Sequence, residues 1–431
     1  MAETSRRAAR GRMGLVTVDQ VLSSASNLLV LLWTAHALAP IDFGRFSLVF
    51  LIYSFAQGAV VRSLVSWTVM AHPEDARQRP RAVLGTAVVL SLAAGLLCLA
   101  AGAALVPLDN PVAVPLLVVG AVLPLLSVQD VGRYLAFAQG RPSRAIVLDT
   151  LWLLLVVAAF GALAWSGTVS LTGIVLAWGV AGAVAGLWVF VQHGVPRRRE
   201  VTLTWLRGRW HFSWRSLVAA SSSATVALVG ALLVALISGP LAVAAVRAAL
   251  LLERPSTTVQ TAVATSAGAD IARERSDNAG LLAHQRRALL VALAVAAVNF
   301  AVLMVLPDAV GRLVLGNVWD LVEPLLLVVS LRVLAMAAQS GVRAALMGRR
   351  QIGVVMVLDI VGTALSIVGL VVGAALGDGE GALWGALVGL SLTVVGWWAA
   401  LVRHLREGDT YPTDVLDADE SDPEADPQRL S

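Results

Sequence analysis

Long hydrophobic runs recur from one end of the chain to the other. Each run reaches or approaches the ~18 residues at which an apolar segment predicts a membrane-spanning helix. The runs should be helical, because a helix satisfies its own backbone in a bilayer, and they lack the alternation typical of a β-barrel. The pattern predicts twelve spans, at 14–38, 44–69, 83–106, 113–138, 145–166, 171–193, 213–238, 241–267, 288–307, 321–347, 352–376 and 382–402.

The arginines indicate how these spans are oriented. There are 32 basic residues besides histidine, and all are arginine. Most fall in the even-numbered connections or at the two ends of the chain, whereas the odd-numbered connections hold only Arg45 and Arg312. Cytoplasmic loops collect positive charge, so this alternation predicts a cytoplasmic-membrane protein with both termini in the cytoplasm.

Composition supports a membrane protein and excludes other classes. Of the 431 residues, 58% are hydrophobic and 14% are charged, whereas about a quarter are charged in a soluble domain. The one cysteine, Cys98, allows neither a disulfide within the chain nor a thiolate metal cluster. The histidines lack metal-ligand spacing, and no glycine-rich phosphate loop is present. We therefore expect no metal, no cofactor, no catalytic residue and no nucleic-acid partner.

An internal repeat divides the chain into two halves. The motifs that recur at an offset of 210 are Gln129, Arg133 and 147–149 in the first half, and Gln339, Arg343 and 357–359 in the second. Six spans separate equivalent positions, so the halves should share one orientation. The fold predicted is all-α, with two six-helix lobes around a central cavity.

The predicted parts of the chain follow from this repeat. They are a cytoplasmic N-terminus (1–13), an N-terminal lobe (14–193), an interlobe linker (194–212), a C-terminal lobe (213–403) and a cytoplasmic tail (404–431). The linker carries Arg197–Arg199 and two tryptophans, so it either lies at the headgroups or is an ordinary connection. The tail carries nine acidic residues and is predicted to be disordered.

Two pairs of intramembrane charges are placed symmetrically about tight turns. Arg133 and Asp149 are equidistant from Arg141, and Arg343 and Asp359 are equidistant from Gln351. Residues equidistant from the turn of a helical hairpin lie at the same depth, so each pair can form a salt bridge between neighbouring helices. A structural role and a gating role both fit these pairs.

The first span sorts its polar residues onto one side. Asp19, Gln20, Ser23, Ser24 and Asn27 fall, with Ser26, within about 160° of arc at 100° per residue. Such a face should line a polar cavity or seal against a polar partner helix. The second span adds Gln57 to the candidate cavity.

Four arginines within the spans lack an acid at the repeat-matched position: Arg62, Arg247, Arg254 and Arg332. An unpaired arginine in a membrane is a functional-site hypothesis, and a guanidinium suits phosphate oxygens. The expected cavity is therefore electropositive and accepts an anion. The alternatives are snorkelling, above all for Arg62, and pairing between helices. The predicted cavity residues are Asp19, Gln20, Ser23, Ser24, Asn27, Gln57, Arg62, Arg247, Arg254 and Arg332.

Two adjacent segments, residues 19–27 and 38–47, carry a resemblance to a known family. Together, and above all in the stretch Phe43-Gly44-Arg45-Phe46-Ser47, they resemble the start of polysaccharide flippases of the O-antigen translocase type. Those flippases belong to the multidrug/oligosaccharidyl-lipid/polysaccharide exporter (MOP) superfamily. The resemblance implies alternating-access export of a polyprenyl-diphosphate-linked glycan, with membrane lipid and glycan-assembly proteins as further partners.

Other functions remain open on the sequence alone. A cation-coupled small-molecule exporter of the same superfamily would favour acids deep in the lobes, whereas the deep charges that lack a matched partner are mostly arginines. A transporter of the major facilitator type would carry a Gly- and Arg-rich loop after the second span, which is absent at residues 72–77. A membrane glycan polymerase or ligase would need a sizeable outer loop, and the outer loops here are short.

Overall fold

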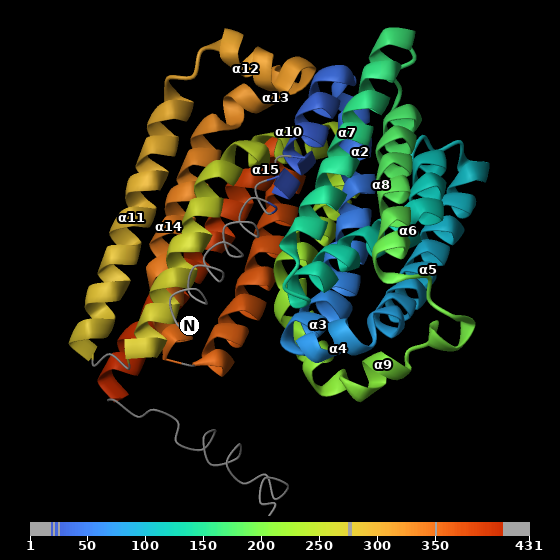
Figure 1. The fold of residues 1–431 in the computed structure, drawn as a ribbon. Helices are drawn as coiled ribbons and strands as arrows, with labels where there is room; N and C mark the ends of the chain where they lie inside the picture. The colour runs from blue at the N-terminus through green and yellow to red at the C-terminus, as the bar shows by residue number, and fades with distance from the viewer. Residues whose placement is uncertain (1–18, 20–21, 25, 275–277, 350, 408–431) are drawn as a thin grey trace, which may run out of the picture. The chain divides into compact units, whose positions relative to one another are not determined.

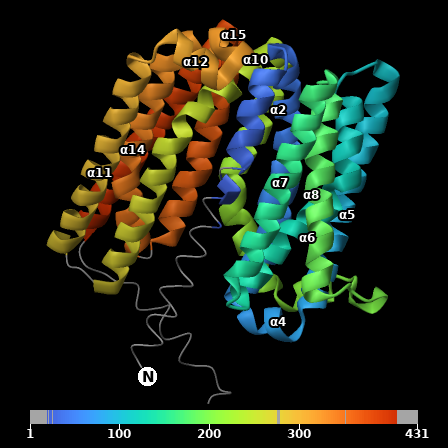
Figure 2. The same ribbon diagram turned by 45° about the horizontal axis from the view of Figure 1, so that its top comes forward.

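The computed structural model describes residues 19, 22–24, 26–274, 278–349 and 351–407 (Figures 1 and 2). Within these residues the regular structure is entirely helical. Nine of the described helices are long and apolar enough to cross a membrane. Two of them, α10 (Trp210–Glu274) and α15 (Ile352–Glu407), each contain two helices joined at a kink, at Gly239 and at Gly377 respectively. With the helical residues 26–37 of the first span, the described chain agrees with the twelve predicted crossings.

The two halves of α15 fold back on each other. A Cβ atom at Gly381 would collide with the carbonyl oxygen of Gly373, and one at Gly385 with that of Gly369. Both pairs are centred on Gly377, which identifies a tight antiparallel hairpin. Residues with no side chain are needed there because the two backbones approach within contact distance.

The chain divides into two compact units. The first contains the described residues up to Leu252 together with Met304–Val329 and Ser366–Val388. The second contains Glu253–Leu303, Ser330–Leu365 and the described residues from Gly389 onward. The predicted lobe boundaries at residues 194–212 follow the repeat rather than this division and stay a prediction.

Several helices of the first unit begin at a proline, which has the φ angle of a helix and lacks an N–H that would otherwise have no partner in the first turn. Such prolines start α2, α4, α5 and α7. The spans of this unit before α10 are α2 (Pro40–Ser54) with η1 (Phe55–Ser66) and α3 (Trp67–Ala71), α5 (Pro80–Leu105) with η2 (Val106–Leu108), α6 (Ala113–Ala138), α7 (Pro142–Ser166) and α8 (Leu171–His193). Short helices α4 (Pro73–Gln78), η3 (Arg198–Glu200) and α9 (Thr204–Gly208) connect them.

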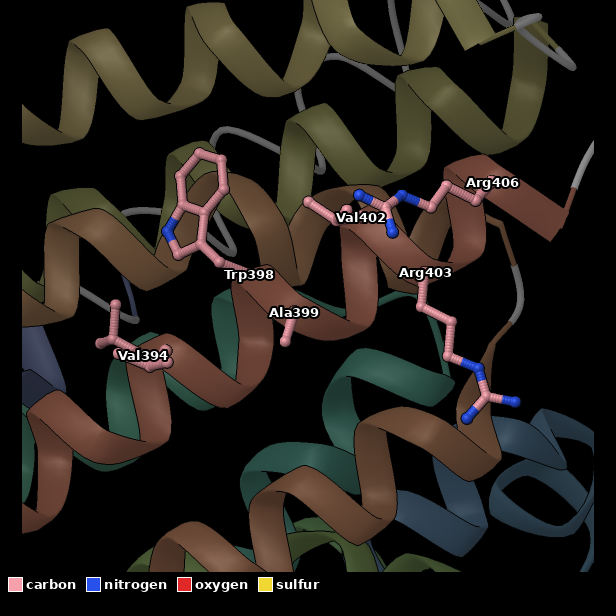
Figure 3. A pocket seen from close by; sticks show the side chains of 7 residues that line it. Val394, Trp398, Ala399, Val402, Arg403 and Arg406 are labelled. Carbon is pink, nitrogen blue, oxygen red and sulfur yellow. The ribbon is translucent and has the colours of Figure 1, made fainter.

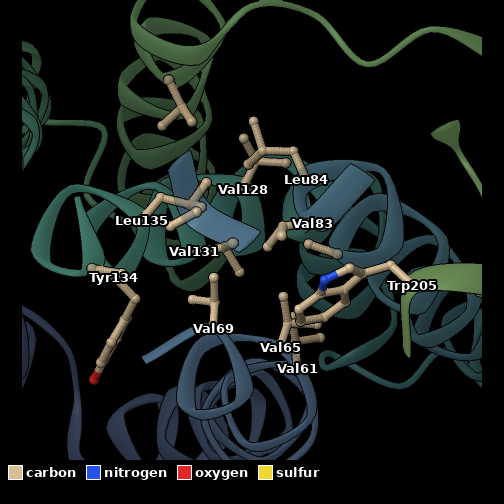
Figure 4. Packing of buried hydrophobic residues seen from close by; sticks show 14 of the residues in the cluster. Val61, Val65, Val69, Val83, Leu84, Val128, Val131, Tyr134, Leu135 and Trp205 are labelled. Atoms are coloured by element: carbon tan, nitrogen blue, oxygen red, sulfur yellow. The ribbon is translucent and has the colours of Figure 1, made fainter. Parts of the chain in front are cut away.

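A hydrophobic core holds these helices together at one end of the unit. Val65 and Val69 of the second span, Val83 of α5 and Val131 of α6 are buried against one another (Figure 4). Trp205 of the linker enters the same core beside Val65. The linker is thus part of the folded unit rather than a separate tether.

The second unit contains α10 from Glu253 onward, nearly all of α11 (Asn278–Met304), most of α14 (Leu326–Gly348) and the outer parts of α15. Its core joins Leu346 of α14 to Trp397 of α15. The short helices α12 (Asp308–Leu315), η4 (Gly316–Val318), α13 (Trp319–Val322) and η5 (Glu323–Leu325) precede α14 and belong to the first unit.

The helix boundaries support the internal repeat. Helix α6 ends at Ala138 and α7 begins at Pro142, while α14 ends at Gly348 and α15 begins at Ile352. Equivalent boundaries therefore differ by the 210 residues that separate the sequence motifs.

Candidate functional site

Arg133 lies at the centre of a buried ionic cluster in the first unit. Its Nη2 atom is 2.6 Å from Oδ2 of Asp19, and its Nε atom is 3.0 Å from Oδ2 of Asp149. Asp130, one turn earlier on α6, lies 3.6 Å from Nη1. The Arg133 side chain is only 5% exposed. The predicted pair Arg133–Asp149 is confirmed, and Asp19 and Asp130 extend it.

Arg62 joins the same cluster from the second span. Its Nη2 and Nε atoms donate hydrogen bonds of 2.7 Å and 3.0 Å to the two carboxylate oxygens of Asp130. This two-bond contact is the strong geometry of an arginine–carboxylate pair. Of the alternatives left open for Arg62, the structure shows pairing between helices, because Asp130 reaches it from α6. Asp130 has Ser340 at its repeat-matched position, so the repeat did not identify it.

Neutral polar side chains complete the cluster. Gln129 donates a 2.9 Å hydrogen bond to Oδ1 of Asp149, and Gln57 accepts a 3.5 Å hydrogen bond from Arg62. The Arg62 guanidinium also lies 5.8 Å from the ring centroid of Tyr134, within range of a cation–π interaction. The cluster combines side chains from the first span, η1, α6 and α7.

The π-helix η1 explains why Gln57 and Arg62 meet. Regular α-helical geometry brings residues three or four apart onto one face and separates residues five apart. A π-helix closes its hydrogen bonds between residues five apart, and η1 spans twelve residues. Gln57 and Arg62 thereby share a face that points to α6. The π-helix is rare in proteins and occurs frequently at functional sites.

The cluster holds three carboxylates and two guanidiniums. Placing charge in a low-dielectric interior is costly unless each ion is compensated, so the third carboxylate needs a proton or a bound cation to balance it. Oδ1 of Asp19 is buried without a hydrogen-bond partner among the described residues. The arrangement is thus suited to taking up positive charge, and two of its acids, Asp19 and Asp149, already share one arginine.

The second unit has the repeat-matched pair in simpler form. Arg343 donates hydrogen bonds of 2.7 Å and 2.9 Å to the two carboxylate oxygens of Asp359, which confirms the predicted pair. Its guanidinium also lies 5.4 Å from the ring centroid of Trp397. The Arg343 side chain is 41% exposed. The position that corresponds to Asp130 is Ser340, so the two halves are chemically unequal.

Arg332 also has an acidic partner on another helix, which was one of the alternatives left open for it. Its Nε atom donates a 2.7 Å hydrogen bond to Oε1 of Glu253, which is buried. Glu253 adjoins Arg254 in sequence but faces α14 instead, because neighbouring residues on a helix point in different directions.

The other predicted cavity residues have varied surroundings. Ser24 is exposed, whereas Ser23 and Asn27 are half-buried and joined by a 2.9 Å hydrogen bond from the Asn27 amide to the Ser23 carbonyl. Gln20 lies outside the described residues. Arg247 is half-buried and engaged in contacts of its own. Asp19 and Gln57 are buried within the ionic cluster. Whether these residues form one substrate cavity stays a prediction.

Arg254 begins a polar stripe on α10 that the sequence analysis missed. Arg254, Thr258, Thr261 and Thr265 are all exposed, and their spacing of four, three and four residues places them on one helix face. Each threonine hydroxyl donates to the carbonyl four residues earlier, so its oxygen remains able to accept a hydrogen bond. Among the described residues, Arg254 has no ion pair. The signal was available in the sequence as threonines at helical spacing after an intramembrane arginine.

A groove of about 780 Å³ lies along the last part of α15 (Figure 3). Val395, Trp398 and Val402 supply its apolar lining, and Arg403 and Arg406 lie at its end nearest the C-terminus. In the described part of the chain, no group of three or more His, Cys, Asp or Glu side chains is placed to hold a metal ion.

Comparisons with known proteins identify solved structures that share this arrangement of helices. No protein-family model and no curated protein matches the sequence. A multidrug resistance MATE family transporter of the MOP superfamily, in an inward-facing conformation, is similar with a TM-score of 0.70 and 15% identity, covering 90% of this chain and 96% of that one. The lipid II flippase MurJ, in an inward closed conformation, has a TM-score of 0.66 and 10% identity, covering 90% of this chain and 87% of MurJ.

A MOP superfamily transporter from Pyrococcus furiosus, described as having a binding pocket of reverse polarity, is similar with a TM-score of 0.60 and 16% identity. That match covers 93% of this chain and 95% of the other. All three structures are transporters or a flippase rather than enzymes. The chain is a multi-pass helical membrane protein with the fold of MOP superfamily transporters.

Proposed function

We propose that this protein translocates a lipid-linked oligosaccharide or polysaccharide precursor across the cytoplasmic membrane by alternating access. The fold supports transport, because transporters and a lipid II flippase share it over about nine-tenths of this chain. The resemblance of residues 19–27 and 38–47 to polysaccharide flippases supports a lipid-linked glycan as the substrate. Orientation with both termini in the cytoplasm and association with glycan-assembly proteins belong to the same proposal.

The polar stripe on α10 is the observation that carries the choice of substrate. Arg254 lies fifteen residues after the Gly239 kink, about 22 Å along the helix axis and therefore deep in the membrane. An exposed arginine at that depth is costly in lipid, so it should face water or an anionic ligand. The threonines beyond it present hydroxyl oxygens over about 10 Å. A guanidinium followed by hydrogen-bond acceptors fits a diphosphate followed by sugar hydroxyls.

Flipping of a polyprenyl-diphosphate glycan by the purified protein in vesicles tests this proposal. We expect Arg254→Ala to weaken apparent substrate affinity about ten- to a hundredfold, the effect of losing a charge-assisted contact of about 1.5–3 kcal/mol. Arg254→Lys should rescue only in part, because an ammonium lacks the two-bond fork. The near-isosteric Thr258→Val, Thr261→Val and Thr265→Val together should reduce affinity for the full glycan more than for the diphosphate lipid bearing one sugar.

The matched control is Arg286→Gln, since Arg286 is an exposed arginine of the same unit near the start of α11. It should leave flipping unchanged. If the wild type and the Arg254 and threonine variants flip the substrate equally, the stripe would no longer support a lipid-linked glycan as the substrate. A purified protein that moves no lipid-linked glycan at all would contradict the proposed function.

The cluster around Arg133 favours a second candidate, a cation-coupled small-molecule exporter. The sequence argument against such an exporter was the excess of arginine over acid within the spans, and in this cluster acids outnumber arginines. Ion-driven efflux of small cationic compounds, with no flipping of glycan lipid, would support the exporter. Efflux lost in Asp19→Asn while the protein stays folded would assign the coupling to the cluster.

A further inference from the structure

The interlobe linker is fixed to the first unit by several contacts. Trp205 and Leu206 are buried in the core of the spans. The Arg209 guanidinium lies 3.0 Å from Oδ2 of Asp75 on α4, and Thr86 of α5 donates a 3.0 Å hydrogen bond to the carbonyl oxygen of Thr202. These contacts hold the segment against the ends of the spans, so its exposed side chains have a defined position.

Three connections meet at this end of the first unit. The linker reaches α4 through Arg209 and Asp75, and the turn between α6 and α7 reaches α4 through a 2.8 Å hydrogen bond from Gln139 to the carbonyl oxygen of Ala76. Figure 1 shows α3, α4 and α9 together at this end, and Figure 2 shows α4 there again. The basic residues of the three connections therefore belong to one end surface.

This surface combines exposed arginines with exposed aromatic rings. Trp210 is 51% exposed, and Phe212 and Trp214, in the first turn of α10, are exposed to 40% and 41%. We call it the basic–aromatic surface, and its exposed members are Arg77, Arg79, Arg141, Arg197, Arg198, Arg199, Arg207, Trp210, Phe212 and Trp214.

The acids of these connections do not neutralise the surface. They are Glu74, Asp75 and Glu200. Glu74 and Asp75 both contact Arg209, and the Glu200 carboxylate accepts a 2.7 Å hydrogen bond from the backbone N–H of Arg197. The exposed arginines therefore leave a strong excess of positive charge.

We infer that the basic–aromatic surface binds the anionic phospholipid headgroups of the adjoining leaflet. The arginine forks match phosphate oxygens in charge and shape. Aromatic side chains at the start of a span are the residues that prefer the headgroup level, where one side of the ring meets hydrocarbon and the other meets water. A soluble acidic partner would account for the arginines but would leave three aromatic rings exposed at the membrane edge. This inference does not rest on the proposed substrate.

The test measures energy transfer from the protein's tryptophans to dansyl-labelled lipids in phosphatidylcholine vesicles, with the full chain and no glycan substrate. We expect labelled phosphatidylglycerol to bind more tightly than labelled phosphatidylcholine. A higher salt concentration should weaken the binding of phosphatidylglycerol. Removing two arginines as Arg198→Gln/Arg199→Gln should weaken phosphatidylglycerol binding about twenty-five-fold, at about fivefold per arginine. The matched control Arg286→Gln/Arg287→Gln removes two exposed arginines of the second unit and should change little.

Three results would overturn the inference. One is equal binding of the two lipids to the wild type, and another is an equal loss in both arginine pairs. The third is a preference for phosphatidylglycerol that is absent in the full chain and present only in a chain that ends at Arg406. That result would mean that the acidic tail, and not lipid, occupies the surface in the full chain. Replacing Trp210 and Trp214 by phenylalanine should reduce the transfer signal while leaving the lipid preference in place, which reports where the bound lipid lies.

Discussion

Removal of the Arg133 charge is the sharpest perturbation that the structure offers. Arg133→Gln would leave Asp19, Asp130 and Asp149 buried with Arg62 as the only arginine of the cluster. Breaking a buried ion pair by removing one partner costs about 3–5 kcal/mol. A typical protein is stable by about 5–15 kcal/mol, so we expect the variant to accumulate poorly and to unfold at a clearly lower temperature.

The matched control comes from the repeat. Arg343→Gln removes the equivalent guanidinium, which is 41% exposed, and leaves one carboxylate, Asp359, that is itself 25% exposed. The loss of stability should be smaller than for Arg133→Gln, because one partly exposed carboxylate loses its partner instead of several buried carboxylates sharing a single remaining arginine. The measurement is thermal unfolding of the purified proteins in one detergent, with abundance in membranes as a second readout.

A compensating change distinguishes charge from packing. Arg133→Gln/Asp149→Asn restores the wild-type balance of one acid in excess, so it should recover part of the lost stability. Exchanging the two charges should not, because an aspartate at 133 would face Asp19 and Asp130. Equal loss from the two single arginine variants, or better rescue by the exchange than by the neutral pair, would refute the reasoning.

Two further outcomes concern the hairpin and the linker. Gly381→Val should lower the free energy of unfolding by about 1–3 kcal/mol, because the new side chain would collide with the Gly373 carbonyl. The control Gly396→Ala meets only ordinary contacts and should be tolerated. Equal thermal unfolding of the two variants would contradict the tight hairpin. Burial would raise the pKa of Asp75, but the hydrogen bond and charge of Arg209 hold it below its ordinary value of 3.8. The stability from this pair is therefore present above pH 3.8 and is lost as pH falls through the lower folded pKa. Unfolding temperatures between pH 6 and pH 3 should decline more steeply for wild type than for Asp75→Asn, and parallel curves would show that the pair contributes nothing.

Much of the fold could be predicted because its determinants are local in sequence. Hydrophobic run length defines the spans, and distance from a turn fixes which residues of a hairpin lie at equal depth. Arg133 and Asp149, and Arg343 and Asp359, follow from that rule. The tight approach of the α15 hairpin is likewise visible in its closely spaced glycines.

The partners of Arg62 and Arg332 could not be predicted in this way, since they are 68 and 79 residues distant in sequence. Their pairing depends on which helices pack together and on how each helix is rotated. The acids within the predicted spans that had no assigned role were Asp130, Glu253 and Glu323, so a search among these three would have narrowed the choice of partners. The rotation of η1 would still have been missed, because an α-helical wheel separates Gln57 from Arg62.

The π-helix has a consequence for comparing this sequence with those of relatives. A segment whose hydrogen bonds close over five residues accommodates more residues in a given number of turns than an α-helix does. A relative with a regular α-helix in the second span would therefore align only with a gap inside an otherwise continuous hydrophobic stretch. Ordinary practice moves such gaps out to the nearest loop, and that would shift every position between the gap and the loop. The residue aligned with Arg62 would then be the wrong one, and its identity would say nothing about the cluster.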